Sequence, residues 1–284
     1  MRSVKGYLAL IVYLGLATAT QAADLNGAAS ETMAGALQPA RLFYVRGDIG
    51  IGRNAISGFS QRELSDNGGS FISKSIGDSP YISAGLGWQL SRRFRLDLTG
   101  EYRSTAQIRA MDNLSVQLTG PDGTLQANTL YQGNLSSYVG LLNGYWDLVN
   151  WRGFTPYVGA GVGFARHTVS GVTTTSSATF TDAGTGILST QLTNGFSDTH
   201  SQTNFAWALM AGTSYDLSPN SKLDLGYRYI NLGSGIAAST SLIDCTCGTV
   251  GSPLKLRELE AHEFRIGIRW QLGATEAAYN HPLK

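Results

Sequence analysis

Eight segments of about ten residues alternate apolar residues with polar residues or glycine. In residues 261–272, for example, Phe264 and Ile266 fall on one face, whereas Glu263 and Arg265 fall on the other. Side chains of a β-strand point alternately to its two faces, so each segment is expected to be a strand with one apolar and one polar face. Two folds fit this pattern: a soluble sandwich whose polar face meets water, and a membrane barrel whose apolar face meets lipid.

The lengths of the connections favour the membrane barrel. The expected strands span residues 42–52, 81–90, 94–103, 137–148, 154–166, 205–217, 222–232 and 261–272. Three short connections alternate with four long ones of roughly 28 to 38 residues, an asymmetry typical of outer-membrane barrels. A compact soluble domain rarely needs four structureless connections of that length. The sequence therefore predicts an all-β fold, an eight-stranded antiparallel up-and-down transmembrane β-barrel over residues 41–272, with four long external loops.

The N-terminus is typical of a secretory signal peptide over residues 1–22. Arg2 and Lys5 precede a short apolar run, and small residues up to Ala22 suit cleavage after that residue. The apolar run is too short to cross a bilayer as a helix. An even number of strands brings both ends of a barrel to the same side. Residues 23–40 and 273–284 are therefore expected to form a periplasmic lead and a periplasmic tail.

Charged residues on the polar faces are expected to fill the barrel. These residues are Arg46, Asp48, Arg95, Asp97, Glu101, Arg103, Asp147, Asp224, Arg228, Glu263, Arg265 and Arg269. Six are positive and six negative, which allows every buried charge a partner. Asn143, Tyr145 and Gln271 can fill gaps in the same network. Eight strands enclose just enough space for such side chains, so we expect a plugged interior rather than an open pore.

Two further expectations concern this interior. The alternating glycines of residues 159–163 would leave room for arginines from the opposite wall. Replacing Arg265 with alanine is expected to destabilise the barrel, because an interior carboxylate would lose its partner.

The tryptophans fall near the ends of the expected strands. They are Trp88, Trp146, Trp151, Trp207 and Trp270. Four lie near the short turns or the end of the last strand, and Trp207 lies near a long loop. Aromatic residues concentrate at the two membrane–water interfaces of a barrel, so these residues are expected to be interfacial aromatics.

The sequence offers little for catalysis, metal binding or nucleic-acid binding. The nearest candidates for a catalytic set are His167 with Ser170, and His200 with Ser201 and Asp198, but no motif fixes nucleophile, base and acid together. The glycine clusters do not open a helix, as a phosphate site requires, and we expect no cofactor. Without Arg2 and Lys5 the chain has 19 basic and 20 acidic residues, which gives no electrostatic case for nucleic acid.

The two cysteines, Cys245 and Cys247, supply too few ligands for a zinc site. After export they are expected to be oxidised, in a disulfide with each other or with another molecule.

Several strand segments resemble the small outer-membrane β-barrel proteins of the OmpA-like, porin-family surface-antigen type found in alphaproteobacteria. The segments are FYVRGDIG at 43–50, FRLD at 94–97, GEYR at 100–103, NGYWD at 143–147, PYVGAGVG at 156–163, LDLGYRY at 223–229 and HEFRIGIRW at 262–270. The resemblance implies the cell outer membrane of a Gram-negative bacterium, with outer-membrane lipid and the barrel-assembly machinery as partners.

The resemblance also implies a non-enzymatic surface protein that supports the envelope or acts as a surface antigen or adhesin. Host or phage surface molecules would then contact its loops. A small passive pore is the first alternative, which the balanced interior charge disfavours. An outer-membrane lipid-modifying enzyme is the second.

Overall fold

A computed structural model describes residues 43–118, 123–234, 236–238, 241–242 and 254–272. The expected signal peptide, lead and tail, together with Cys245 and Cys247, lie outside the described residues. No helix among the described residues is long and apolar enough to cross a membrane.

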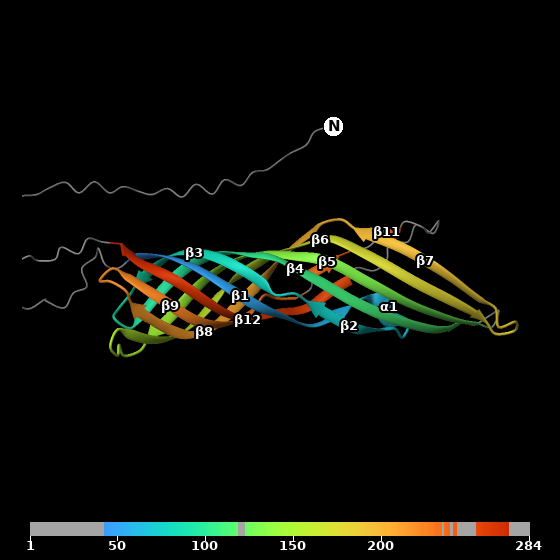
Figure 1. Ribbon diagram of the computed structural model, residues 1–284, viewed down its shortest axis with the longest axis horizontal. Coiled ribbons are helices and arrows are strands. Elements are labelled where there is room, and N and C mark those ends of the chain that lie inside the picture. Colours follow the sequence, from blue (N-terminus) through green and yellow to red (C-terminus); the bar gives the residue numbers. More distant parts are fainter. Residues whose placement is uncertain (1–42, 119–122, 235, 239–240, 243–253, 273–284) are drawn as a thin grey trace, which may run out of the picture. The chain divides into compact units, whose positions relative to one another are not determined.

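Eight strands form a closed antiparallel ring (Figure 1), which confirms the predicted fold class. In ring order they are β1 (Phe43–Ser60), β3 (Ser79–Gln89), β4 (Phe94–Leu118), β5 (Gly123–Asp147), β6 (Phe154–Asp182), β8 (His200–Asp216), β9 (Ser221–Asn231) and β12 (Leu254–Leu272). The ring closes where β12 pairs with β1, for example Val45 opposite Trp270. Closure gives every strand two neighbours and removes the unpaired edges that lipid could not hydrate.

Short turns join the strands at one end of the ring. The amide of Leu90 donates to the carbonyl of Phe94 over 2.9 Å, and the amide of Leu217 donates to that of Ser221 over 3.0 Å. Gly153 adopts a φ of 87° in the turn between β5 and β6, a conformation that glycine reaches without strain. We call this end the short-turn end.

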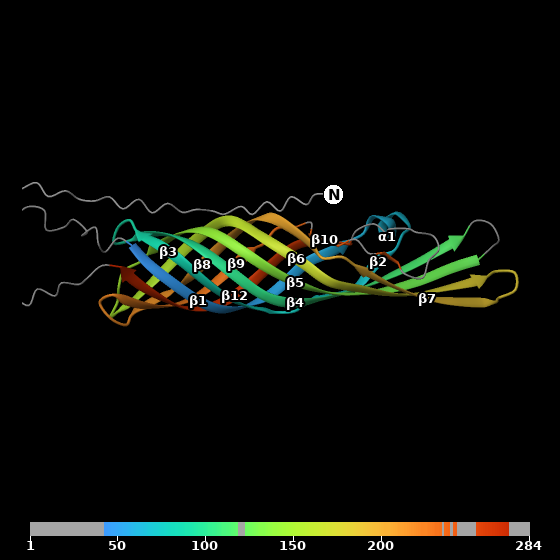
Figure 2. The same ribbon diagram turned by 90° about the horizontal axis from the view of Figure 1, so that it is seen from above.

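The long connections expected at the other end are largely β-strand, so the strands are longer than expected. Strands β4, β5 and β6 each reach 25 residues or more, and β7 (Leu188–Ser197) extends the β6 hairpin. Helix α1 (Arg62–Asp66), β2 (Ser70–Ile76), β10 (Ile236–Ala238) and β11 (Ser241–Leu242) complete this end (Figures 1 and 2). Sequence reasoning missed these strands because runs such as 173–179 carry threonine and serine on both faces. Threonine favours extended backbone, but such runs show no apolar alternation.

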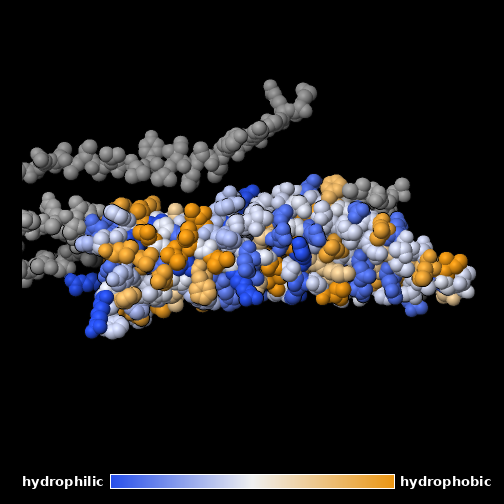
Figure 3. Space-filling model, in the orientation of Figure 1, coloured by the Kyte–Doolittle hydropathy of each residue, from blue (hydrophilic) through white to orange (hydrophobic). Residues whose placement is uncertain are grey.

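Two belts of outward-facing aromatic side chains bound the apolar part of the outer surface. The first belt, at the short-turn end, comprises Phe43, Trp88, Phe94, Trp146, Phe154, Tyr215 and Trp270. The second comprises Tyr102, Tyr138, Phe164, Phe205, Trp207, Tyr227, Tyr229 and Phe264. Along β4 the segment from one belt to the other, Phe94 to Tyr102, is nine residues long, which suits a tilted transmembrane strand. Exposed Ile82, Leu98 and Leu142 lie between them, and apolar residues gather over this part of the surface in Figure 3.

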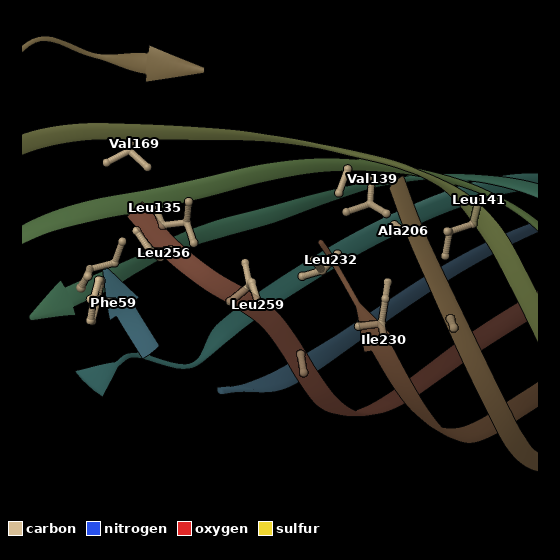
Figure 4. Close-up of a cluster of buried hydrophobic side chains, with 14 of the residues drawn as sticks. Phe59, Leu135, Val139, Leu141, Val169, Ala206, Ile230, Leu232, Leu256 and Leu259 are labelled. Carbon is tan, nitrogen blue, oxygen red and sulfur yellow. The ribbon is translucent and has the colours of Figure 1, made fainter. Parts of the chain in front are cut away.

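The strands continue beyond the second belt as a structure that we call the distal extension. It comprises residues 53–60, 62–76, 104–118, 123–136, 166–203 and 254–261. Its interior is mostly apolar: Phe59, Leu135, Val169, Leu256 and Leu259 are buried and project between the strands (Figure 4). Between the belts, the strands therefore present apolar side chains outward and charged side chains inward. Beyond the second belt, the inward-facing side chains are mostly apolar.

Candidate functional site

The interior between the two belts is filled by charged side chains. All twelve charged residues expected to face inward are buried there, none more than 6 % exposed. Each lies on the face of its strand opposite to the exposed apolar residues, because strand side chains alternate.

Two arginines and two glutamates form a closed cluster near the second belt. Arg228 contacts Glu263 at 2.5 Å and Glu101 at 2.6 Å. Arg103 contacts Glu101 at 3.0 Å and also pairs with Glu263. Each charge therefore has two partners of opposite sign, drawn from β4, β9 and β12. Tyr81 from β3 covers the cluster, with the guanidinium of Arg228 5.0 Å from its ring centre.

A second cluster lies nearer the short-turn end. Arg46 contacts Asp48 at 2.6 Å and Asp97 at 2.7 Å, and Arg269 contacts Asp224 at 3.1 Å. Asn143 donates to the second oxygen of Asp97 over 2.8 Å. These contacts join β1 to β4 and β12 to β9, and all five charged side chains are buried.

Aromatic rings complete the interior. The guanidinium of Arg95 lies 4.0 Å from the ring centre of Tyr145 and 4.9 Å from that of Tyr157, and its Nε donates to Asp147 over 3.0 Å. Sequence reasoning missed the inward-facing Tyr44, Tyr81 and Tyr157. The strand alternation could have revealed them. Tyr44 has the same parity as Arg46, and Tyr81 and Tyr157 are directly followed by the outward-facing Ile82 and Val158.

Two expectations about this interior were wrong. Arg265 has no carboxylate within ion-pair distance among the described residues; it donates to the hydroxyls of Tyr145 at 3.3 Å and Tyr157 at 3.4 Å. Its removal would therefore not leave a carboxylate without its direct partner. Gly159 and Gly161 make room for Tyr145 and Asn143 of the neighbouring strand β5, rather than for arginines from the opposite wall.

The apolar core of the distal extension lies beyond these charged clusters. His167 lies at its boundary and is fully buried. The Ser137 hydroxyl donates to Nδ1 over 2.7 Å, and Nε2 donates to the carbonyl of Leu232 over 2.9 Å. Burial lowers the pKa of His167, because the charged imidazole would lose its hydration. A neutral ring with one donor and one acceptor satisfies both contacts.

The Ser137–His167 pair does not have the arrangement of a catalytic site. The second ring nitrogen binds a carbonyl rather than a carboxylate, and no part of His167 is open to a substrate. Of the candidate pairs expected from the sequence, His167 and Ser170 make no hydrogen bond in the described part of the chain. Ser201 makes a hydrogen bond with Thr168 at 3.0 Å. Within the described part of the chain no three His, Cys, Asp or Glu side chains gather as metal ligands do.

The β6–β7 hairpin forms the most exposed apolar surface of the distal extension. On β7, Leu188, Leu192 and Phe196 share one face and are 66 %, 67 % and 50 % exposed. The register places them opposite Thr181, Ser177 and Thr173 of β6. The hairpin projects at the right of Figure 1, away from the short-turn end, and residues 172–197 carry one charge, Asp182.

Comparison with known proteins assigns the family. The outer membrane protein β-barrel domain family matches residues 9–271. The chain belongs to this family. The match confirms the predicted resemblance and a location in the outer membrane of a Gram-negative bacterium.

Relatives of this chain include proteins named as adhesins. An uncharacterized protein of Brucella abortus is 29% identical over 81% of this chain and 84% of its own length. The outer membrane protein PagN of Salmonella typhimurium is 35% identical over 51% of this chain and 52% of its own length. A putative adhesin of Rickettsia canadensis is 29% identical over 54% of this chain and 58% of its own length.

Solved structures of outer-membrane proteins are also similar. OprG of Pseudomonas aeruginosa matches with a TM-score of 0.45 and 12% identity, covering 83% of this chain and 97% of that one. Neisserial surface protein A matches with a TM-score of 0.40 and 17% identity, covering 81% of this chain and 97% of that one.

Proposed function

We propose that this chain is a non-enzymatic adhesin that holds the distal extension outside the cell and contacts other surfaces through the β6–β7 hairpin. The observation that carries the proposal is the row of exposed Leu188, Leu192 and Phe196 on a hairpin beyond the second aromatic belt. Exposed apolar side chains between the belts have lipid as their partner. Those on β7 lie about nine or more residues further along the strands, where water would surround them unless another surface covers them.

The interior supports this proposal over a pore. Ion pairs fill the ring between the belts, and an apolar core fills it again beyond the second belt. An interior filled in this way favours a rigid scaffold with a long hairpin, which is suited to recognition, over a path for solutes. The relative named as a putative adhesin is consistent with the same role.

The nearly uncharged hairpin indicates the chemistry of its target. A polyanion would be bound by clustered arginine or lysine, and residues 172–197 contain neither. Leucine, phenylalanine and threonine instead suit a protein surface with apolar and neutral polar groups.

Adhesion of bacteria that display shortened variants tests the proposal. The register allows residues 176–193 to be replaced by Asn-Gly while Thr175 stays paired with Asn194. A matched control replaces residues 115–126 of the β4–β5 hairpin by Asn-Gly and keeps Leu114 opposite Ala127. A non-adherent Gram-negative strain would produce the native chain or either variant, and bacteria bound to cultured epithelial cells would be counted.

We expect the native chain and the β4–β5 control to confer adhesion, and the β6–β7 variant to lose most of it at equal surface levels. Heat-modifiable electrophoretic mobility would verify that each barrel is folded. Equal adhesion by the β6–β7 variant, or no adhesion by the native chain, would overturn the proposal.

A further inference from the structure

The outer surface between the belts carries a row of small residues across four strands. Gly47, Ala84, Gly100 and Gly140 are successive partners on β1, β3, β4 and β5. Phe164 of β6 ends the row beside Gly140. Because these residues all point outward, the row forms the floor of a trough rather than part of the interior.

Larger side chains line both sides of this floor. The row on the side of the distal extension is Ile49, Ile82, Tyr102, Tyr138 and Arg166, and the row on the other side is Val45, Leu86, Leu98, Leu142 and Val162. A groove of about 580 Å³ occupies the central part, over Ala84, Gly100 and Gly140. We call it the lipid-facing groove.

Internal packing does not explain the glycines of the floor. A side chain at Gly100 or Gly140 would meet no atom of the described chain within 4 Å. Neither residue adopts a positive φ, so the backbone conformation does not require glycine. Glycine within a strand has an entropic cost, and it often marks a place where another molecule approaches the backbone. The space above the floor is therefore suited to an occupant from outside the chain.

The rim of the groove pairs aromatic residues with a cation. Tyr102 and Tyr138 pack against each other with ring centres 5.1 Å apart at the level of the second belt. Arg166 lies directly beyond them, is exposed, and has no carboxylate within 4 Å among the described residues. Thr203 lies beside it on β8 and also lines the groove. An arginine just outside an aromatic belt lies at the depth of lipid phosphates, which its planar guanidinium binds well.

We propose that the lipid-facing groove is a binding site for one acyl chain of a phosphorylated glycolipid, lipopolysaccharide of the outer leaflet, whose phosphate is held by Arg166. The apolar floor and walls bury the acyl chain, and the tyrosine pair fixes where the chain meets its headgroup. The assignment of the leaflet rests on the orientation given in the proposed function, in which the distal extension lies outside the cell. The adhesion of the hairpin and the binding of lipid are measured separately, so that either can fail alone.

Lipid retention by the purified full chain tests the site. The variant Gly100→Leu/Gly140→Leu fills the floor, and Arg166→Gln removes the cation while keeping a polar side chain. Ala211→Leu adds the same kind of apolar bulk on the outer face of β8, opposite Val158 and Tyr227, and Arg53→Gln removes an exposed cation of β1 that does not line the groove. Each protein would be extracted in mild detergent, and lipopolysaccharide per chain would be measured by mass spectrometry. Binding of added lipopolysaccharide and of phosphatidylglycerol would then be titrated.

We expect the floor variant to retain at least about fivefold less lipopolysaccharide and Arg166→Gln to bind it roughly tenfold more weakly, with both controls like the native chain. Equal retention by Arg166→Gln and the native chain would overturn the phosphate contact. Equal retention by a folded floor variant would overturn the groove. Equal affinity of the native chain for phosphatidylglycerol would overturn the assignment to the glycolipid.

Discussion

Arg265 donates a hydrogen bond to the hydroxyl of Tyr145 over 3.3 Å, from the opposite side of the ring. No described carboxylate lies within ion-pair distance of this arginine, and its Nε has no hydrogen-bond partner. Arg228, on β9 in the same interior, instead lies between two glutamates. The interior charges are therefore equal in number but unequal in how they are held.

This difference predicts unequal effects of removing the two arginines. Arg228→Met would leave Glu101 and Glu263 sharing Arg103 alone, and losing one member of a buried ion-pair cluster costs about 3–5 kcal/mol of unfolding free energy. Arg265→Met is expected to cost less, because it breaks only long hydrogen bonds to neutral hydroxyls. Urea unfolding from lipid vesicles measures both. A larger loss for Arg265→Met than for Arg228→Met would contradict the pairing scheme.

A compensated variant separates lost packing from unpaired charge. Arg228→Met combined with Glu263→Leu removes one charge of each sign and leaves Arg103 with Glu101 at 3.0 Å. We expect the double variant to be more stable than Arg228→Met alone, since replacing a whole buried ion pair by apolar residues is often nearly neutral. The comparison uses the same unfolding measurement, and a double variant less stable than the single one would count against this account.

The apolar core of the distal extension is expected to contribute to the stability of the whole barrel. Leu259 is 2 % exposed within that core, so Leu259→Ala should lower the unfolding free energy by about 2–5 kcal/mol. Leu192→Ala on the exposed face of β7 is the matched control and should have little effect. If both variants unfold at the urea concentration of the native chain, the distal extension is not a packed core.

Acid is expected to weaken the fold through His167. Its pKa is lowered in the folded state, so the stability that its neutral form contributes is fully present above about pH 6.5. That stability is lost as the pH falls from there towards the folded-state pKa, because the unfolded chain then binds a proton that the folded chain does not. The native chain should therefore lose more stability between pH 7 and pH 5 than His167→Gln, which cannot titrate. Parallel pH profiles of the two proteins would contradict this.

The sequence predicted the fold because each strand has lipid on one face and a charged interior on the other, so apolar and polar residues must alternate along it. In β12, for example, Phe264 and Arg265 can face only opposite ways, and the ring follows once eight such segments are connected by alternating short and long links. The distal extension could not be predicted by the same rule. Residues 173–179 consist of threonine, serine and alanine only and show no alternation of apolar and polar residues. Their strand therefore depends on pairing with β5 and β7 rather than on an apolar face.

The candidate sites, too, were predicted only in part. Alternation identified which charges lie inside, but it carries no information on distance, so the isolated position of Arg265 was missed. The lipid-facing groove was missed for a related reason: it depends on register, which alone places Ala84, Gly100 and Gly140 side by side on three strands.

Ion conductance of the refolded chain in a planar lipid bilayer tests the central claim most directly. Ion pairs between the belts and the apolar core beyond them should block permeation. We therefore expect no discrete channel openings from protein that is stably inserted in the bilayer. Reproducible openings of uniform size would contradict the account, because they would show a continuous water path past Arg46, Arg228 and Leu259.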